Sequence, residues 1–218
     1  MPSMRAALIT LFAFALAFAL PAGAQQPEKF QQGRHYMAID PAQPTSSGSK
    51  IEVLTVFMYT CPHCYDLEPY LNKWKASKPA DVAYAPFPAA WDPVSEAFAR
   101  AYYAAETLGI LEASHDKLFA AIHKERKPFR SLDDLAQWYT QFGVTKEAFL
   151  SAAQSFAVNT KINRSKTMVP RWGVAGTPSV IVNGKWRLDV GSAGGQQNVI
   201  ELIDMLVARE RAAAKPGA

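Results

Sequence analysis

The residues of this chain best suited to chemistry are its two cysteines, Cys61 and Cys64, which are separated by Pro62 and His63. The other 216 positions contain no cysteine (218 − 2 = 216). A disulfide stabilises a fold mainly by closing a long loop in the unfolded chain, and a bridge between these two would close a very short one. Thiol–disulfide chemistry therefore explains the pair better than structural cross-linking does.

The elements predicted around the pair favour an acidic thiol at Cys61. Residues 51–58 are rich in β-branched and apolar side chains and predict a buried central strand. The two cysteines follow at the start of a predicted helix, where Pro62 suits the first turn. Unpaired N–H groups and the positive end of the helix dipole stabilise a thiolate at Cys61. Cys64, one turn further in, is expected to be more buried and less acidic.

The side chain of His63 is expected to help stabilise that thiolate. It can donate a hydrogen bond to the Cys61 sulfur or, when protonated, place positive charge beside it. A stabilised thiolate stabilises the reduced protein, so the disulfide form becomes more oxidising. For a two-electron couple about 30 mV corresponds to about 1.4 kcal/mol, so lowering a pKa by about four units corresponds to roughly 100 mV. An acidic Cys61 therefore favours an oxidase over a reductase.

Metal and haem sites fit the pattern less well. A c-type haem site needs a histidine directly after the second cysteine, where this chain has Tyr65. A structural zinc site needs four ligands, and besides the cysteines only four histidines are available: His35, His63, His115 and His123. The last two lie on a predicted helix and are interpreted as ordinary surface or boundary histidines. No metal site is expected.

The first residues have the pattern of a secretory signal peptide. Arg5 precedes an apolar run over residues 6–20, and Ala22-Gly23-Ala24 offers a cleavage site after Ala24. The run is shorter than the roughly 20 residues that a membrane-spanning helix needs, although an uncleaved anchor helix is the alternative. Residues 1–24 are therefore expected to direct export to a compartment that permits disulfides.

The remaining chain divides into a discontinuous core and a helical block. Residues 25–49 are expected to form an irregular leader. Residues 50–92 carry a strand–helix–strand pattern, and residues 170–212 carry a strand–strand–helix pattern. Between them, residues 93–169 are helical throughout. This order predicts an α/β fold in which a parallel core with an antiparallel hairpin is interrupted by a helical insertion.

Capping residues and glycines divide the helical block into five predicted helices. Ser131 and Thr145 are the expected N-caps of the third and the fourth. The fifth is expected to begin at Asn159 or Thr160 and to reach Trp172.

A second informative segment, Gly176-Thr177-Pro178-Ser179, precedes a predicted hairpin. The hairpin joins residues 179–182 to residues 185–190 through Asn183-Gly184, a pair that suits the positive φ angles of a type I′ turn. A bond preceding proline can be held in the cis form. Together with the upstream cysteine pair, the segment predicts a cis peptide bond before Pro178.

On these residues the chain resembles the DsbA family of periplasmic thiol–disulfide oxidoreductases. The resemblance covers nearly all of the mature chain and rests on the segment Phe57-Met58-Tyr59-Thr60-Cys61-Pro62-His63-Cys64, the helical block and Gly176-Thr177-Pro178. It implies a thioredoxin-like fold with an inserted all-helical domain. It also implies that Cys61 is the exposed nucleophile and Cys64 the buried resolving thiol. Pro178 would face the sulfur pair across a groove in which Thr177 offers backbone groups to an unfolded peptide.

The resemblance further implies a periplasmic dithiol oxidase that needs no bound cofactor. Its substrates would be reduced, unfolded, newly exported proteins, and its reoxidant a DsbB-like quinone-linked membrane protein. Nucleic acid is not an expected partner, because the net charge of +4 is scattered rather than gathered into a basic stripe. A monomer is expected, because residues 25–49 are too few for the dimerisation domain of the usual isomerase design.

Two other functions are compatible with the same residues. A reductase or isomerase could use the same fold, and its lower potential would distinguish it from an oxidase. A redox-inert exported peptide-binding protein would turn over no dithiol substrate.

The chain departs from the family pattern at one position of the first predicted strand. Family members often carry a buried acid six residues before the nucleophile, where it manages the proton of the buried thiol. Here that position is Thr55. Glu52 is expected on the opposite face of the strand because side chains alternate. The sequence therefore identifies no group that handles the proton of Cys64.

Overall fold

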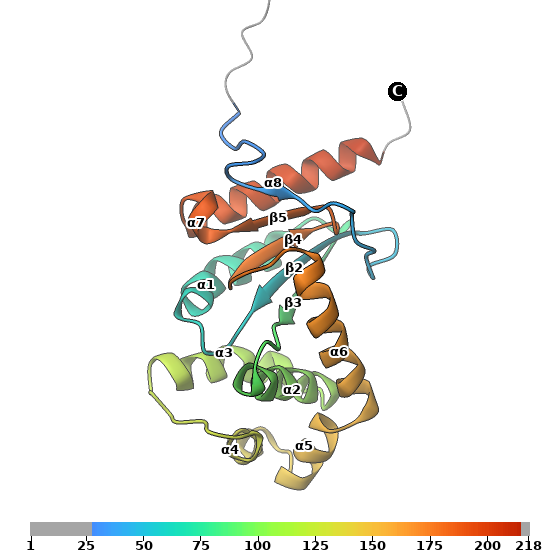
Figure 1. The fold of residues 1–218 in the computed structure, drawn as a ribbon. Helices are drawn as coiled ribbons and strands as arrows, with labels where there is room; N and C mark the ends of the chain where they lie inside the picture. Colours follow the sequence, from blue (N-terminus) through green and yellow to red (C-terminus); the bar gives the residue numbers. More distant parts are fainter. Residues whose placement is uncertain (1–27, 215–218) are drawn as a thin grey trace, which may run out of the picture.

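A five-stranded mixed sheet forms the centre of the protein, whose computed structural model describes residues 28–214 (Figure 1). The predicted signal peptide lies outside the described residues. The strands follow the order β1–β5–β4–β2–β3. Their bounds are β1 (Met37–Ala38), β2 (Ile51–Phe57), β3 (Val82–Pro88), β4 (Ser179–Val182) and β5 (Trp186–Asp189). β2 pairs in parallel with β3 and antiparallel with β4, and all its residues are buried, as expected for a central strand.

Helices cover both faces of this sheet. On one face, α1 (Pro62–Ser77) and α8 (Gln196–Ala213) pack against β2 and β4, with the short α7 (Val190–Ala193) leading into α8. Leu71 of α1 and Leu202 of α8 share a buried cluster with Val53 of β2. On the other face, the C-terminal end of α6 (Phe156–Arg171) places Met168 in a buried cluster with Val56. The sheet is thus buried on both sides.

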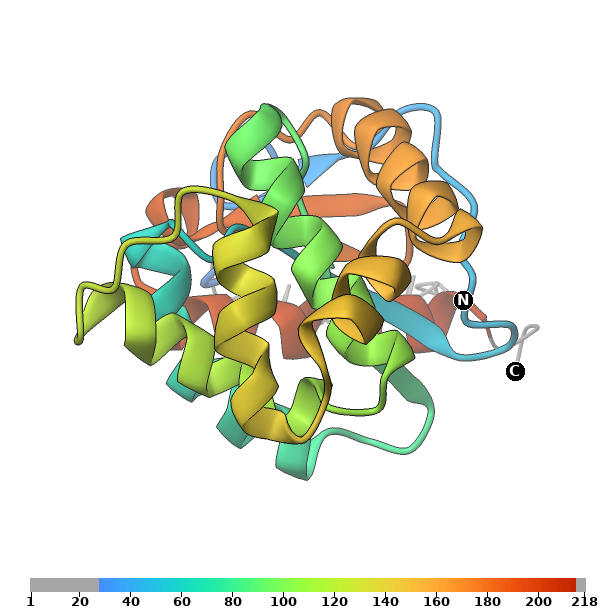
Figure 2. The ribbon, with the colours of Figure 1, turned by 90° about the horizontal axis from the view of Figure 1, so that it is seen from below.

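The helical insertion lies between β3 and β4 in the chain and packs around α2, as seen from below in Figure 2. Its elements are α2 (Pro93–Thr107), α3 (Leu111–His123), α4 (Leu132–Tyr139), the 3-10 turn η1 (Thr140–Phe142), α5 (Lys146–Ala153) and α6. The buried cluster of the insertion also contains Phe57, Tyr59 and Cys64. The hydrophobic core of the insertion is therefore continuous with the cysteine-bearing end of the sheet.

The predicted N-caps of two insertion helices are confirmed. Ser131 Oγ accepts a hydrogen bond from the Asp134 N–H at 3.1 Å. Thr145 Oγ1 accepts from the Ala148 N–H at 3.1 Å. In both helices a side-chain oxygen satisfies an N–H group that has no partner within the helix.

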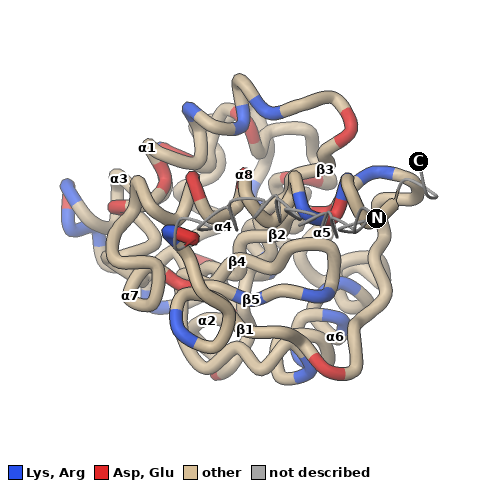
Figure 3. The backbone as a smooth tube through the Cα atoms, turned by 90° about the horizontal axis from the view of Figure 1, so that it is seen from above, with Lys and Arg blue, Asp and Glu red and all other residues tan. Residues whose placement is uncertain are grey.

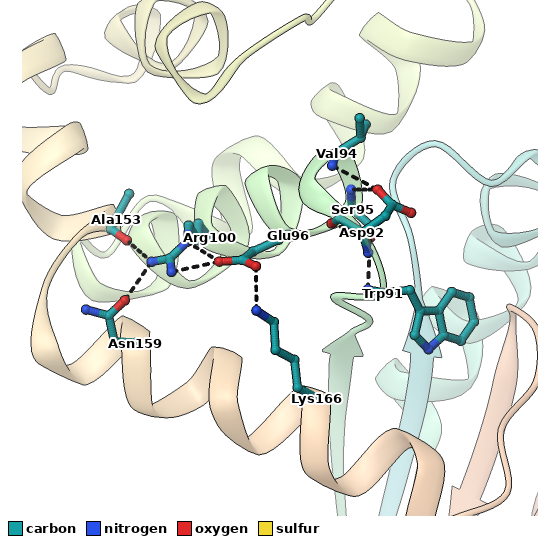
Figure 4. A network of polar contacts seen from close by, with 9 residues as sticks. All are labelled: Trp91, Asp92, Val94, Ser95, Glu96, Arg100, Ala153, Asn159 and Lys166. Atoms are coloured by element: carbon teal, nitrogen blue, oxygen red, sulfur yellow. Dashed lines mark hydrogen bonds and ion pairs between the residues drawn. The ribbon is translucent and has the colours of Figure 1, made fainter.

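The predicted start of the last insertion helix is wrong. Ser155 caps α6 by accepting from the Val158 N–H at 3.3 Å, so Asn159 and Thr160 lie inside the helix. The amide of Asn159 has a different role, because its Oδ1 accepts a hydrogen bond from Arg100 Nη1 at 2.8 Å (Figure 4). An asparagine that binds a neighbouring helix has the same local sequence signature as one that caps its own.

Ion pairs and a capping box fix the position of α2. Asp92 and Ser95 form a reciprocal capping box at the start of the helix. Glu96 lies between Arg100, at 2.8 Å, and Lys166 of α6, at 2.7 Å (Figure 4). α2 is therefore tied to α6, whose other end packs on the sheet.

The expected irregular leader is in part an edge of the sheet. Met37 and Ala38 form β1, with Met37 opposite Arg187 of β5. Phe30 and Tyr36, which precede the strand, are buried in the cluster beneath α8. The prediction of a wholly irregular leader is therefore corrected, because these residues complete the sheet and its core.

The predicted hairpin is confirmed, and its turn requires glycine. Asn183 and Gly184 both have positive φ angles, of 52° and 64°. The Gln43 N–H donates to the Gly184 carbonyl at 2.9 Å. A Cβ at Gly184 would lie 2.0 Å from the Gln43 carbonyl oxygen, so the leader packs directly on the turn.

A buried carboxylate joins α8 to this hairpin. Glu210 is 4% exposed and accepts hydrogen bonds from Asn183 Nδ2 at 2.7 Å, Lys185 Nζ at 2.8 Å and Trp186 Nε1 at 2.7 Å. Burial alone would raise the pKa of Glu210, but these donors lower it below its ordinary value. The carboxylate therefore stays charged and accepts the hydrogen bonds of all three donors.

Glu210→Ala is expected to lower the free energy of unfolding by about 3 kcal/mol, because it leaves three donors without their acceptor. Denaturant unfolding of the oxidised protein measures this loss. Glu201→Ala is the control on the same helix; it removes an exposed pair with Lys29 and is expected to cost far less stability than Glu210→Ala. Equal losses in the two variants would contradict a structural role for the Glu210 cluster.

Candidate active site

β2 ends just before the cysteine pair and α1 begins within it. Cys61 occupies the N-cap position of α1, with φ −86° and ψ 116°, and Pro62 is the first helical residue. Both cysteines are free thiols. Cys61 is partly exposed, whereas Cys64 is 2% exposed and packs in the core shared with the insertion. One sulfur is thus accessible to a substrate and the other is enclosed.

The local hydrogen bonds make Cys61 acidic and lower its pKa to about 5. The largest contribution is a hydrogen bond from the Cys64 side chain, which outweighs the opposing effect of burial. Smaller contributions come from the Thr177 side chain and from the backbone N–H groups of Cys64 and His63. When protonated, the Cys61 thiol donates to the Thr177 carbonyl at 3.3 Å. Cys61 is therefore a thiolate at neutral pH.

Cys64 has the opposite character. Burial raises the pKa of the Cys64 thiol well above its ordinary value, and the hydrogen bond to Cys61 raises it further. The reduced site consequently holds one thiolate and one thiol that share a hydrogen bond. This asymmetry is what a nucleophile and a resolving thiol require.

His63 contributes to the site through its backbone and lines the adjacent groove. Its contribution to the Cys61 pKa comes from the backbone N–H. His63 is exposed and lines a groove together with Pro178. That the ring itself acts on the Cys61 sulfur stays a prediction.

A groove borders the cysteine pair on the side of the β4 strand. The peptide bond between Thr177 and Pro178 is cis, as predicted. These two residues line the groove together with His63, Arg187 and Val190. The Thr177 carbonyl reaches Cys61, so a chain lying in the groove would pass next to the accessible sulfur.

Sequence reasoning missed two histidines that contact the segment before Cys61. His115 Nδ1 lies 2.7 Å from the hydroxyl of Tyr59, which is 1% exposed. His123 Nε2 donates to the Tyr59 carbonyl at 2.8 Å, and its ring stacks on Tyr65 at a centroid separation of 5.0 Å. The available signal was their spacing of about two helical turns, which places both on one side of α3.

At the position of the missing family acid, the structure shows an unpaired hydroxyl. Thr55 is 3% exposed, and its Oγ1 has no hydrogen-bond partner. Glu52 lies on the opposite face of β2, as predicted, where its carboxylate accepts from the Ser46 N–H at 2.9 Å and from Ser46 Oγ at 2.8 Å. Glu52 is therefore bound elsewhere and does not replace the acid.

Thr55→Val is expected to raise the free energy of unfolding by about 1 kcal/mol, because it removes a buried hydroxyl that has no partner. It is also expected to leave the rate of dithiol oxidation unchanged. Ser165→Ala is the matched control: its hydroxyl is buried too but donates to the Pro88 carbonyl at 2.7 Å, so its loss should destabilise the protein. Slower oxidation by Thr55→Val would show that Thr55 handles a proton.

The chain is similar to proteins of one family along most of its length. A family model described as a DSBA-like thioredoxin domain matches residues 52–202. The thiol:disulfide interchange protein DsbA of Pseudomonas aeruginosa is 36% identical over 208 residues, which cover 95% of this chain and 97% of that protein. DsbA of Pseudomonas syringae pv. tomato is 38% identical over 192 residues, covering 88% and 90%.

Solved structures agree with the sequence comparisons. The crystal structure of Pseudomonas aeruginosa DsbA superposes with a TM-score of 0.83 at 36% identity, covering 87% of this chain and 99% of that one. The oxidoreductase DsbA from Xylella fastidiosa gives a TM-score of 0.77 at 32% identity, covering 82% and 96%. The predicted thioredoxin-like α/β fold with a helical insertion is confirmed. With its acidic, accessible Cys61 beside a buried Cys64, the chain belongs to the DsbA family of thiol–disulfide oxidoreductases.

Proposed function

We propose that the protein acts as an oxidase, donating a Cys61–Cys64 disulfide to reduced, newly exported proteins. The observation that carries the proposal is the pKa of Cys61, lowered to about 5 beside a Cys64 thiol whose pKa is raised. A stabilised thiolate favours the reduced state of the protein. The disulfide form is therefore a strong acceptor of electrons from substrate thiols.

The reaction proceeds through a mixed disulfide. A substrate thiolate attacks Cys61 Sγ, the Cys61–Cys64 bond breaks, and Cys64 leaves with the electron pair and takes up a proton. A second substrate thiolate then attacks the substrate sulfur of the mixed disulfide. The bond to Cys61 breaks, and Cys61 leaves as a thiolate. Two substrate thiols lose two electrons and two protons; the dithiol site gains both electrons, one proton stays on Cys64 and one is released.

The groove beside Pro178 is the proposed binding site for the substrate chain. Its lining includes Thr177, whose carbonyl contacts Cys61, and the exposed His63. Backbone groups bind an unfolded chain without regard to its side chains. This arrangement supports broad specificity for the sequence around the reacting cysteine.

The periplasm is the proposed location, and a DsbB-like quinone-linked membrane protein is the proposed reoxidant. The signal-peptide pattern of residues 1–24 supports export. Among residues 28–214, no helix is long and apolar enough to cross a membrane. Basic and acidic residues are interspersed along the backbone tube in Figure 3, which supports protein rather than nucleic-acid substrates. The oxidase is proposed to work as a monomer and without a cofactor.

Equilibration in glutathione buffers of graded ratio tests the direction of the reaction. We expect the Cys61–Cys64 couple to have a potential well above roughly −220 to −260 mV, the range of the cytosolic glutathione pool. A potential near about −270 mV, as in thioredoxin, would instead indicate a reductase. A protein that turns over no dithiol substrate would be a redox-inert peptide-binding protein.

A further inference from the structure

A cluster of metal-ligating side chains lies in the seam between α1 and α3, apart from the cysteine pair. Glu68 belongs to α1, and His115 and Asp116 belong to α3. A carboxylate oxygen of each acid and one ring nitrogen of His115 lie within 4.8 Å of one another. The same residues line a cavity together with Asn72.

One ring nitrogen of His115 has a hydrogen-bond partner and the other has none. Its Nε2 is buried and makes no hydrogen bond, although Glu68 Oε1 is only 3.3 Å away. Its Nδ1 lies 2.7 Å from the Tyr59 hydroxyl. A metal-binding histidine typically donates its second ring N–H to such an acceptor, which fixes the ring and leaves the other nitrogen free to bind. In the tautomer that carries its proton on Nδ1, toward Tyr59, Nε2 has a lone pair available for a ligand bond.

We propose that Glu68, His115 and Asp116 bind one Zn²⁺ ion. Tetrahedral zinc with bonds of about 2.1 Å places neighbouring ligand atoms about 3.4 Å apart, close to the 3.3 Å between His115 Nε2 and Glu68 Oε1. Asp116 is exposed, so a change in its side-chain rotamer can close the remaining distance. One nitrogen and two carboxylate ligands leave a fourth position for water.

The charges around the cavity suit a divalent cation. Glu68 and Asp116 bring two negative charges to the site, while Asn72 Nδ2 lies 3.2 Å and 3.3 Å from the two Asp116 oxygens and orients that carboxylate. Lys75, which also lines the cavity, is paired at 3.0 Å with Glu112. Its charge is therefore neutralised by Glu112, and two carboxylates remain for the ion.

The proposed site would connect the two parts of the fold. Glu68 lies one helical turn after Cys64 on α1, which packs on the sheet, and the other two ligands lie on α3 of the insertion. A zinc ion bound by both helices stabilises the folded state by mass action, because the unfolded chain does not hold the three ligands together. Zinc binding at this site does not depend on whether the cysteine pair acts as an oxidase or as a reductase.

Titration of the oxidised protein with zinc chloride tests the proposal. In the disulfide form Cys61 and Cys64 cannot bind zinc as thiolates, so calorimetry should report one ion per chain bound by other residues. Co²⁺ used in place of zinc should give the intense visible absorption of a tetrahedral site. We also expect zinc to raise the melting temperature.

Substitution of the ligands should weaken zinc binding by at least about tenfold, a loss seen even for outer-shell partners. The variants are His115→Gln, Glu68→Gln and Asp116→Asn, and the last, at an exposed position, should not disturb folding. His35→Gln is the matched control, since this histidine lies on the leader. The proposal is overturned if the oxidised protein shows no saturable binding, if Asp116→Asn binds zinc as the wild type does, or if His35→Gln loses binding equally.

Discussion

Cys64→Ser and Cys64→Ala are both expected to reduce catalysed dithiol oxidation to the background rate, because neither variant can form the Cys61–Cys64 disulfide. The two variants should differ in the acidity of Cys61. The hydrogen bond from the Cys64 side chain is the largest cause of the low Cys61 pKa. Serine retains a donor at this position and alanine removes it. We therefore expect the Cys61 pKa to stay near 5 in the serine variant and to rise in the alanine variant.

Thiolate absorbance followed against pH measures the acidity, and oxidation of a dithiol peptide measures the turnover. Cys61→Ser provides the complementary control, since its remaining thiol is buried and has a raised pKa. It should react with an alkylating reagent far more slowly than Cys64→Ser at mildly acidic pH. Turnover by Cys64→Ala, or equal Cys61 pKa values in the two Cys64 variants, would contradict the mechanism.

The stability of the reduced protein should increase relative to the disulfide form as the pH rises from about 5 to about 8.5. The pKa of Cys61 is about 5 in the folded reduced protein, against about 8.5 for an unfolded thiol. A group with a depressed folded pKa contributes stability that is fully present above the unfolded pKa and is lost as the pH falls through the folded one. Because Cys61 is partly exposed, solvent screening weakens the effect, and the contribution is expected to be at most about 3 kcal/mol at pH 7. Above about pH 8.5, Cys64 has the opposite effect, because its thiol ionises only in the unfolded chain.

Denaturant unfolding of both redox forms across this pH range measures the effect. The disulfide form has no titrating thiol, so subtracting its stability removes the contributions of all groups that titrate equally in both forms. Reduced Cys61→Ser should lose most of the pH dependence. A stability difference that stays flat between about pH 5 and pH 8 would mean that the thiolate is not selectively stabilised in the fold.

Local sequence was sufficient to predict the features that depend on a few consecutive residues. The strand that leads into Cys61, the caps at Ser131 and Thr145, and the Asn183-Gly184 turn are each determined by neighbouring backbone and side-chain groups. The fold class followed from the order of these elements and from the family resemblance. The position of Cys64 in the core followed from its place one turn into α1.

The features that could not be predicted depend on contacts between distant segments. β1 has only two residues, and its extended form depends on the edge of β5. The contact of His115 with Tyr59 depends on how α3 packs against the end of the sheet. The direction of the His63 ring likewise depends on a groove formed by residues near Pro178. Periodicity and capping signals carry no information about such contacts.

The two outer strands of the sheet matter for a protein that exchanges disulfides with other protein chains. Exposed strand edges can template aggregation by pairing with a foreign chain. At one edge, β3 contains Pro86 and Pro88, which have no N–H to offer a new strand. At the other edge, β1 ends after two residues. The sheet is therefore poorly suited to extension by a client polypeptide at either side, which protects the protein from co-aggregating with the chains it oxidises.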